Sequence, residues 1–286
     1  MEYDYVIVGG GSAGSVLAAR LSENPDVSVC LLEAGGDGKD LMIKVPIGAA
    51  VFLRGLFKIN NWAFQTVPQK GLNGRSGFQP RGKALGGSSA INAMLYIRGV
   101  PQDYDNWERE GAKGWGWKDV LPFFRKSENN IRGADELHGN DGPLQVSELR
   151  APMAINEAFI EAAGEHQIRH NKDFNGKEQE GVGHYQVTQF HEHGREGERC
   201  SVAAAYLHPV MHRNNLTVLT RSQATRIVFE GKRAVAVEYR KKRKTLNVKA
   251  KREVILCGGA FNSPQLLQLS GIGYLLLSIL STSSHL

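Results

Sequence analysis

The chain has few cysteines and no long apolar run. Its three cysteines, Cys30, Cys200 and Cys257, show no paired spacing, which argues against a disulfide-built scaffold and for a reducing compartment. No apolar run reaches the ~18 residues that span a bilayer, and no secretory signal precedes the first apolar segment. We therefore expect a cytoplasmic protein without an integral membrane segment. Peripheral association with an inner membrane stays open.

Positive charge gathers in one short region. The formal net charge is +6, and much of it lies in residues 240–244 and 249–252. Such a run can attract nucleic acid or anionic lipid, but no aromatic residues interleave with it as base stacking requires. We predict a solvated hairpin end and no nucleic-acid partner. The composition is otherwise that of a globular protein with room for one large or two modest domains.

A glycine motif near the N-terminus organises the chain. Residues 3–8 are β-branched and aromatic and predict a buried strand. Gly9, Gly11 and Gly14 follow directly as G-x-G-x-x-G, and apolar residues at helical spacing continue the pattern. In such a motif the first glycine permits a tight turn and the second lets a pyrophosphate approach bare backbone. The third lets the helix pack close to the strand.

An acidic residue completes this motif. Residues 27–32 predict a second buried strand ending at Glu33, about 20 residues past the last glycine, where an acid accepts hydrogen bonds from ribose hydroxyls. A carboxylate there repels a 2′-phosphate, so NADP is disfavoured while FAD and NAD both stay open. The helix begins near Ser12 and Ala13. Its N-terminus there offers unpaired N–H groups and the positive end of the helix dipole to phosphates. The sequence therefore predicts dinucleotide binding.

A second glycine-rich stretch covers residues 81–99. Gly86 and Gly87 permit close approach of the backbone, and short polar side chains such as Ser88 and Asn92 follow. This combination suits a large, mostly apolar ring system fixed by a few hydrogen bonds, which a flavin is. A serine-capped loop ahead of a short helix is the alternative interpretation.

Three ordered motifs resemble one family. Residues 82–99, with Asp105 beyond them, are similar to the first sequence motif of the glucose–methanol–choline (GMC) flavoprotein oxidoreductases, and residues 259–273 are similar to the second. The resemblance covers residues 1–273 and is closest to the choline dehydrogenase and acceptor-linked alcohol dehydrogenase branch. It implies a Rossmann-like α/β FAD-binding fold with a parallel sheet and a β-hairpin, plus an incomplete α+β substrate subdomain.

The resemblance also implies a FAD site. Some relatives attach the flavin through a histidine where this chain has Ile91, so non-covalent binding is expected. In relatives the residue matching Ala224 contacts adenine through its backbone. The residues expected to bind FAD are Gly9, Gly11, Ser12, Ala13, Gly14, Glu33, Ala34, Gly86, Gly87, Ser88, Asn92, Ala93, Met94, Leu95 and Ala224.

The domain organisation follows from the same resemblance. We expect the first part of the FAD-binding domain in residues 1–150, a partial substrate-side segment in 151–199, and the second FAD-binding part in 200–273. Residues 274–286 form a Leu/Ser-rich tail unlike the family. Within this arrangement Ile155 and Phe159 should mark the apolar face of a helix.

The helix of the second family motif has its own end signals. Ser263 can cap the helix, Pro264 suits its first position, and Gly271 suits its end.

In the family, the histidine that serves as catalytic base, and its His or Asn partner, lie in a C-terminal part with no counterpart here. We therefore name no catalytic residue. His191 and His193 lack a third ligand at convincing spacing, so no metal is expected.

The whole enzyme implied by the resemblance oxidises the CH–OH group of choline or a primary alcohol by hydride transfer to flavin N5, and passes electrons to an acceptor. This chain alone is expected to be inactive. One alternative is a non-catalytic flavin or nucleotide binder. Another is an NAD-dependent Rossmann enzyme, which residues 82–99 argue against.

Overall fold

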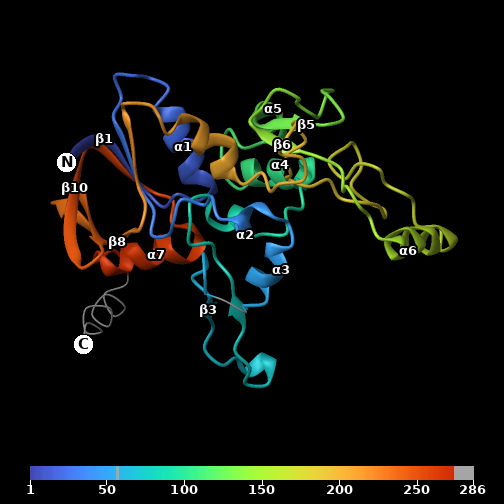
Figure 1. The fold of residues 1–286 in the computed structure, drawn as a ribbon, viewed down its shortest axis with the longest axis horizontal. Helices are drawn as coiled ribbons and strands as arrows, with labels where there is room; N and C mark the ends of the chain where they lie inside the picture. Colours follow the sequence, from blue (N-terminus) through green and yellow to red (C-terminus); the bar gives the residue numbers. More distant parts are fainter. Residues whose placement is uncertain (56–57, 274–286) are drawn as a thin grey trace. The chain divides into compact units, whose positions relative to one another are not determined.

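The computed structural model describes residues 1–55 and 58–273. Contacts divide the chain into two compact units, one made of residues 1–92 with the segment from 201 onward, the other of residues 93–200. Figure 1 labels their elements. The predicted domain limits are drawn from the family resemblance and stay predictions. The expected tail at residues 274–286 lies outside the described residues.

The first unit is built on a six-stranded mixed sheet with the order β7-β2-β1-β10-β9-β8. The strands β7, β2, β1 and β10 are parallel, whereas β10, β9 and β8 form an antiparallel meander. The strands are β1 (Glu2–Val8), β2 (Val29–Leu32), β7 (Leu216–Leu219), β8 (Ser222–Glu230), β9 (Arg233–Lys241) and β10 (Lys244–Leu256). This confirms the expected α/β class with a parallel sheet and a hairpin.

The long strand β10 joins the two halves of this sheet. Its first residues, from Lys244 to Lys249, pair with β9, and its later residues pair with β1 up to Val8 and Leu256. The turn at residues 242–243 between β9 and β10 carries the basic run, as the predicted hairpin end requires. One strand therefore carries the chain from the meander into the parallel core, where its carboxyl end lies beside that of β1.

Alternation along the parallel strands sends side chains into two separate cores. Ile7 and Leu31 pack on one face with α1 (Ser12–Leu21) and η3 (Ala203–Leu207). Val6 and Cys30 pack on the other face with the meander and with α7 (Gly259–Leu269). The buried positions of α1 are small, namely Gly14, Ser15, Ala18 and Ala19. The helix can therefore lie close to the strands.

The start of α7 differs from the prediction. The helix begins at Gly259, with Gly258 as its N-cap, and Pro264 lies inside it. Ser263 therefore does not cap the helix. Pro264 is the sixth residue of the helix, so it lacks the N–H that would bond to the carbonyl of residue 260, and its ring crowds that carbonyl. The predicted end is confirmed, because Gly271 has φ +85° and the Ile272 N–H bonds back to the Leu267 carbonyl at 2.9 Å.

Short elements complete the first unit around the glycine-rich stretch. The segment after Glu33 forms two short helices and a two-stranded hairpin before the chain reaches η2 (Gly87–Ala90). The remaining elements are α2 (Leu41–Lys44), α3 (Gly48–Leu53), β3 (Phe64–Gln65), η1 (Lys70–Leu72), β4 (Phe78–Gln79) and η4 (His208–Val210). Between residues 62 and 67, only β3 is a regular strand.

The second unit contains α4 (Pro101–Arg109), α5 (Trp117–Ser127) and α6 (Ala154–Glu165), with a small parallel pair of β5 (Glu128–Asn130) and β6 (Leu144–Val146). The expected apolar face of α6 is not buried, since Ile155 and Phe159 are each 68% exposed. Among the described residues, no helix is both long enough and apolar enough to cross a bilayer.

A network of buried charges lies inside this unit. Arg98 Nη2 is 2.7 Å from Glu128 Oε2, and His138 places Nδ1 3.0 Å from Glu128 Oε1 and Nε2 3.0 Å from Asp173 Oδ2. Hydrogen bonds to Asp173 and Glu128 raise the pKa of His138 to about 9, against the effect of burial. The buried charge of His138 is therefore a product of the fold.

Candidate functional site

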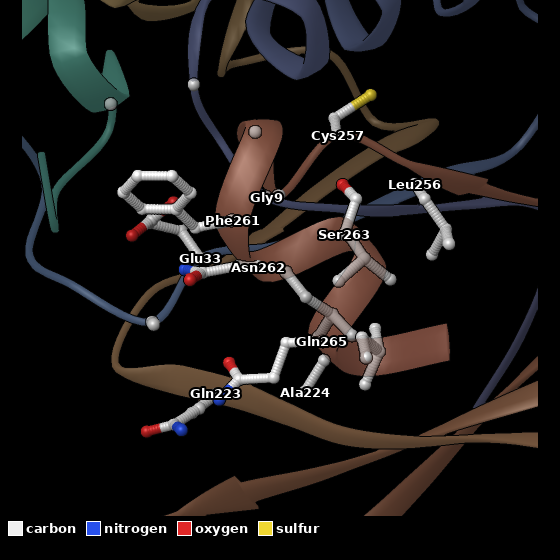
Figure 2. A pocket seen from close by; sticks show the side chains of 18 of the residues that line it. Gly9, Glu33, Gln223, Ala224, Leu256, Cys257, Phe261, Asn262, Ser263 and Gln265 are labelled. Atoms are coloured by element: carbon white, nitrogen blue, oxygen red, sulfur yellow. The ribbon is translucent and has the colours of Figure 1, made fainter. Parts of the chain in front are cut away.

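A cavity of about 1240 Å³ lies in the first unit, where the parallel strands end. Figure 2 shows its labelled residues arriving from separate segments of the chain: Gly9 and Glu33 after β1 and β2, Gln223 and Ala224 in β8, Leu256 and Cys257 at the end of β10, and Phe261, Asn262, Ser263 and Gln265 in α7. Ligands of open α/β sheets bind at this edge, beyond the carboxyl ends of the strands.

The first glycine motif has no room for side chains where it packs. Gly9 has φ +103°, and a Cβ there would overlap the carbonyl oxygen of Cys257, while a Cβ on Gly14 would overlap the carbonyl oxygen of Gly9. Gly11 has more room. The atoms nearest to a Cβ added at Gly11 would be Gly87 Cα at 3.8 Å and the Cys257 carbonyl oxygen at 3.9 Å. Gly11 lines the cavity, so a side chain there would enter the space.

The N-terminus of α1 meets the same cavity. Gly11 is the N-cap, no side chain caps the helix, and the first turn contains no acidic residue. Ser12 and Ala13 are exposed and line the cavity. The first N–H groups of a helix have no intrahelical acceptor and carry the positive end of its dipole. This end of α1 can therefore receive an anion such as a phosphate.

The two glycine motifs are in contact. The Gly86 N–H donates to the Gly10 carbonyl at 2.7 Å, and Gly87 lies so close to Gly11 that a Cβ on Gly87 would be 2.7 Å from Gly11 Cα. Gly87 and Ser88 line the cavity from this position. The backbone of the second glycine motif thus lines the same cavity as the first glycine motif.

Glu33 is buried at the end of β2 and lines the cavity. Its Oε2 accepts the Gly10 N–H at 2.9 Å, and its Oε1 accepts the Gly35 N–H at 2.7 Å. Loss of hydration raises the pKa of Glu33 to about 7, although the two N–H groups and the charge of Lys83 act in the opposite direction. Each carboxylate oxygen keeps a further lone pair, so hydroxyl donors can still bind.

The predicted site residues divide into three groups. Those that line the cavity are Gly9, Gly11, Ser12, Ala13, Glu33, Ala34, Gly87, Ser88 and Ala224. Gly14, Gly86 and Asn92 belong to the same unit but not to the lining, and Gly14 and Gly86 serve its packing. Ala93, Met94 and Leu95 belong to the second unit. The binding roles of all three groups stay predictions.

An aromatic group at the cavity was not predicted. Trp62 and Phe261 line the space, and Phe64 lies between them, stacked on Trp62 at 5.8 Å and edge-on to Phe261 at 5.8 Å. Lys83 lies over the Trp62 ring at 4.2 Å and Arg81 over the Phe261 ring at 4.4 Å. Residues 62–67 alternate apolar and polar side chains, and such alternation by itself indicates a strand with its aromatic residues in the core. The contact of Phe64 with Phe261 depends on tertiary structure, and no pattern in the sequence indicates it.

The hairpin arginines also reach the cavity. Arg226, Arg240 and Arg243 are exposed and line it together with Glu238. The sequence predicted a solvated hairpin end, which is correct for the turn. It did not show that strand pairing places Gln223 opposite Arg240 and so turns part of the basic run toward the cavity. This end of the space therefore carries an excess of positive charge.

One buried polar atom in the lining lacks a partner. Among the described residues, none makes a hydrogen bond with the buried Oδ1 of Asn262, which lies in the first turns of α7 at the cavity. A bound molecule with a donor group would satisfy it. The described residues contain no group of three or more His, Cys, Asp or Glu side chains arranged to hold a metal ion.

The fold and the cavity define a Rossmann-type nucleotide-binding unit, and comparison with known proteins gives its family. The family model of the GMC oxidoreductases matches residues 3–275. The chain belongs to the GMC oxidoreductase family. This confirms the resemblance found in the three motifs.

Relatives of known name agree with this family. The chain is 51% identical over 274 residues to an alcohol dehydrogenase [acceptor] of Pseudomonas putida, covering 95% of this chain and 48% of that protein. It is 46% identical over 277 residues to the mitochondrial choline dehydrogenase of Homo sapiens, covering 95% and 46%. The chain thus spans about half the length of the curated relatives it matches.

Solved structures show the same fold. The crystal structure of a pyridoxine 4-oxidase from Mesorbium loti matches with a TM-score of 0.86 and 39% identity, over 95% of this chain and 52% of that one. An FAD-dependent oxidoreductase from Chaetomium thermophilum matches with a TM-score of 0.85 and 31% identity, over 95% and 48%.

Proposed function

We propose that this chain binds FAD without a covalent bond, with its ADP half in the cavity of the first unit. The N-terminus of α1 receives the pyrophosphate against Gly11, and Glu33 accepts hydrogen bonds from the adenosine ribose. Backbone atoms at Ala224 contact the adenine. The flavin end lies toward Gly87 and Ser88, and the other predicted residues of the first unit belong to this same proposed site. Ile91 offers no nucleophile for attachment.

The observation that carries this proposal is the meeting of two glycine motifs around one space. Gly11 and Gly87 leave bare backbone on two sides of it, and an uncapped helix N-terminus opens into it. The orphan acceptor of Asn262 and the excess of arginine fit a ligand that carries donors and negative charge. One relative with the same fold is an FAD-dependent oxidoreductase, which supports the choice of FAD over NAD.

We further propose that the chain is the nucleotide-binding part of an alcohol oxidoreductase. Bound flavin supplies a hydride acceptor for the CH–OH carbon of choline or a primary alcohol, and an electron acceptor then regenerates it. The named relatives are alcohol and choline dehydrogenases. We name no catalytic residue here, since none of the nine histidines lies in a segment resembling the family's active-site motif. We expect the chain alone to bind the cofactor without oxidising alcohols.

A second candidate function is a non-catalytic flavin or nucleotide binder. It is favoured by the cavity, whose lining offers bare backbone and a helix N-terminus for a nucleotide and includes no residue to which we assign a catalytic role. Both candidate functions use the same cavity, and only the first makes the chain part of an enzyme that oxidises an alcohol. Activity of the purified chain with choline or a primary alcohol and an artificial acceptor would contradict both the non-catalytic role and our expectation of inactivity.

The cofactor proposal is tested by spectroscopy and by one substitution. The purified chain should show the absorption bands of bound flavin. After denaturation and filtration, the flavin should be in the filtrate and not with the protein, because it is not covalently attached. Gly11→Ala should reduce the affinity for FAD and for ADP at least tenfold, since the new Cβ points into the cavity where the pyrophosphate approaches. Isothermal titration of the flavin-free protein measures both affinities.

Gly164→Ala is the matched control, because a Cβ at that position meets nothing within 4 Å and the residue lies in α6 of the other unit. Its affinity should equal that of the wild type. A colourless protein that binds NAD but not FAD would overturn the proposal.

A further inference from the structure

Asn262 carries a buried acceptor that no contact within the fold satisfies. It lies in the first turn of α7 and lines the cavity, and among the described residues none donates a hydrogen bond to its buried Oδ1. A buried acceptor left unpaired costs free energy, which a bound donor recovers. The position therefore suits a ligand group that donates a hydrogen bond.

Asn262 and Glu33 lie on opposite sides of the backbone that follows β1. A Cβ added to Gly258 would lie 3.2 Å from Asn262 Cβ, and one added to Gly9 would lie 3.0 Å from Gly258 Cα. On the other side, the Gly10 N–H donates to Glu33 Oε2 at 2.9 Å. Two acceptor side chains thus flank the first glycines of the N-terminal motif.

The spacing of these two acceptors suits a pair of neighbouring hydroxyl groups. In the sheet β1 separates β2 from β10, and because neighbouring strands lie about 4.8 Å apart, the ends of β2 and β10 are about 10 Å apart. In the view of Figure 2 the Asn262 amide points toward the part of the cavity where Glu33 lies. A small group between the two side chains can donate one hydrogen bond to each.

The ADP half of FAD offers few donors to choose from. Ionised phosphates carry none. The adenine amino group belongs near Ala224 in the proposed site, and the α7 side chain on that side of the cavity is Gln265, one turn beyond Asn262 (Figure 2). The ribose has two hydroxyl groups on adjacent carbon atoms, and both can donate. The ribose is therefore the group that matches two acceptors on either side of one backbone segment.

We propose that Asn262 accepts a hydrogen bond from one hydroxyl of the adenosine ribose, while Glu33 accepts one from the other. This inference rests on the proposed function, which places the ADP half of FAD in the same cavity. It makes Asn262 a binding residue whose acceptor is paired only in the nucleotide complex. Asn262 thus selects ribonucleotides over analogues that lack one hydroxyl.

Three nucleotides and two variants of Asn262 test the proposal. Isothermal titration of the full flavin-free chain measures the affinity for ADP, 2′-deoxy-ADP and 3′-deoxy-ADP. The wild type should prefer ADP to each analogue by about tenfold, because each analogue leaves one acceptor unpaired. Asn262→Leu should remove the preference over one analogue and keep the preference over the other. Asn262→Asp retains an acceptor, so both preferences should remain, although its charge weakens the binding of all three nucleotides.

Asn247→Leu is the matched control. Asn247 is exposed on β10 in the same unit and does not line the cavity, so the three affinities should equal those of the wild type. Without nucleotide, Asn262→Leu should melt no lower than the wild type by circular dichroism, because it removes an unpaired buried acceptor. Asn262→Ala should give the same nucleotide preferences as Asn262→Leu without the bulk of leucine.

Three results with the Asn262→Leu and Asn262→Ala variants overturn the inference. They are preferences equal to those of the wild type, an equal weakening for all three nucleotides, and a loss of both preferences, which would assign both hydroxyls to one side chain. Each of these leaves the proposed cofactor site in place, because ADP still binds to the wild type. A wild-type chain that binds no ADP would overturn the proposed function and this inference together.

Discussion

Two buried glutamates, one in each unit, have pKa values that are shifted in opposite directions. Glu33 accepts the N–H groups of Gly10 and Gly35, and loss of hydration raises its pKa to about 7. Burial also acts to raise the pKa of Glu128, but hydrogen bonds and charge from His138 and Arg98 outweigh it and hold that pKa below its usual range. Two carboxylates of the same type and similar burial thus differ because only one has cationic partners in contact.

The difference shows how each group relates to a ligand. Glu128 is enclosed in a network where Arg98, His138 and Asn130 already contact its oxygens, so its charge serves packing. Glu33 borders a cavity and keeps unused lone pairs. A carboxylate that is costly to ionise in the folded protein gains most from a partner that donates hydrogen bonds, and ribose hydroxyls are such donors. An incompletely compensated buried charge at a cavity is typical of a functional site.

The largest expected effect comes from breaking the Glu128 network. Arg98→Met should destabilise the second unit by about 3–5 kcal/mol, because it removes one of the two cationic partners of a buried carboxylate. Trp107, Trp115 and Trp117 all lie in that unit, so tryptophan fluorescence during chemical denaturation measures the effect. Arg20→Met, which removes an exposed pair with Glu23, is the control and should cost less than about 1 kcal/mol.

The same measurement at high pH sharpens this prediction. The pKa of His138 in the folded state is raised to about 9. Its contribution to stability is therefore complete below about pH 6.5 and is lost as pH rises through 9. The cost of Arg98→Met measured at neutral pH should thus differ from that at pH 10, where the imidazolium is absent. An unchanged cost would show that His138 is not charged in the network.

The next largest effect concerns Glu33, whose folded-state pKa is also raised and whose contribution to stability therefore also falls as pH rises. Because its folded-state pKa is about 7 and its unfolded pKa is near the ordinary value, the folded state holds the proton more tightly. Stability from this group is therefore present below about pH 4.5 and is lost as pH rises through 7, by roughly 3 kcal/mol.

Glu33→Gln tests this, because glutamine does not ionise. Denaturation followed by circular dichroism, without cofactor, should show the difference in unfolding free energy between wild type and variant change between pH 5 and pH 8, in favour of the variant. A difference that is constant with pH would mean that Glu33 has an ordinary pKa.

The smallest expected effect links Glu33 to the proposed ligand. Hydroxyl donors bind the carboxylate better than the carboxylic acid, so the affinity for ADP should rise as pH increases from 6 to 8, by roughly tenfold or less. Isothermal titration measures it, and Glu33→Gln should remove the pH dependence. If the wild type and the variant show the same pH profile, the ribose does not contact Glu33.

Much of the fold could be predicted because its signals are local. The strand ending at Val8, the glycines after it and the second strand ending at Leu32 follow from alternation and glycine spacing, and the structure contains them. The hairpin of β8 and β9 follows in the same way. The start of α7 could not be predicted. Ser263 and Pro264 are by themselves typical of a helix start, whereas in the structure the helix already begins at Gly259, shortly after β10 ends.

The candidate site was predicted in its parts but not in its assembly. The glycines and Glu33 were identified from spacing, and nine of the predicted residues line the cavity. Trp62, Arg240 and Phe261 were missed as site residues because their positions at the cavity depend on strand pairing and helix packing. The helix that carries Ile155 is present, as predicted, but its apolar face is exposed. Periodicity shows that a face is apolar, but not whether another element covers it.

By itself, the sequence determined the local conformations and the chemical character of each segment: which backbone positions must lack a side chain, where strands end, and which carboxylate follows the glycines. These depend on interactions between near neighbours along the chain. Only the tertiary structure decided that Gly11 faces Gly87, that Glu33 has a raised pKa, and that Glu128 and His138 are charged partners. Distance and burial between remote residues set those properties, because desolvation and Coulomb interaction depend on surroundings that local sequence does not contain.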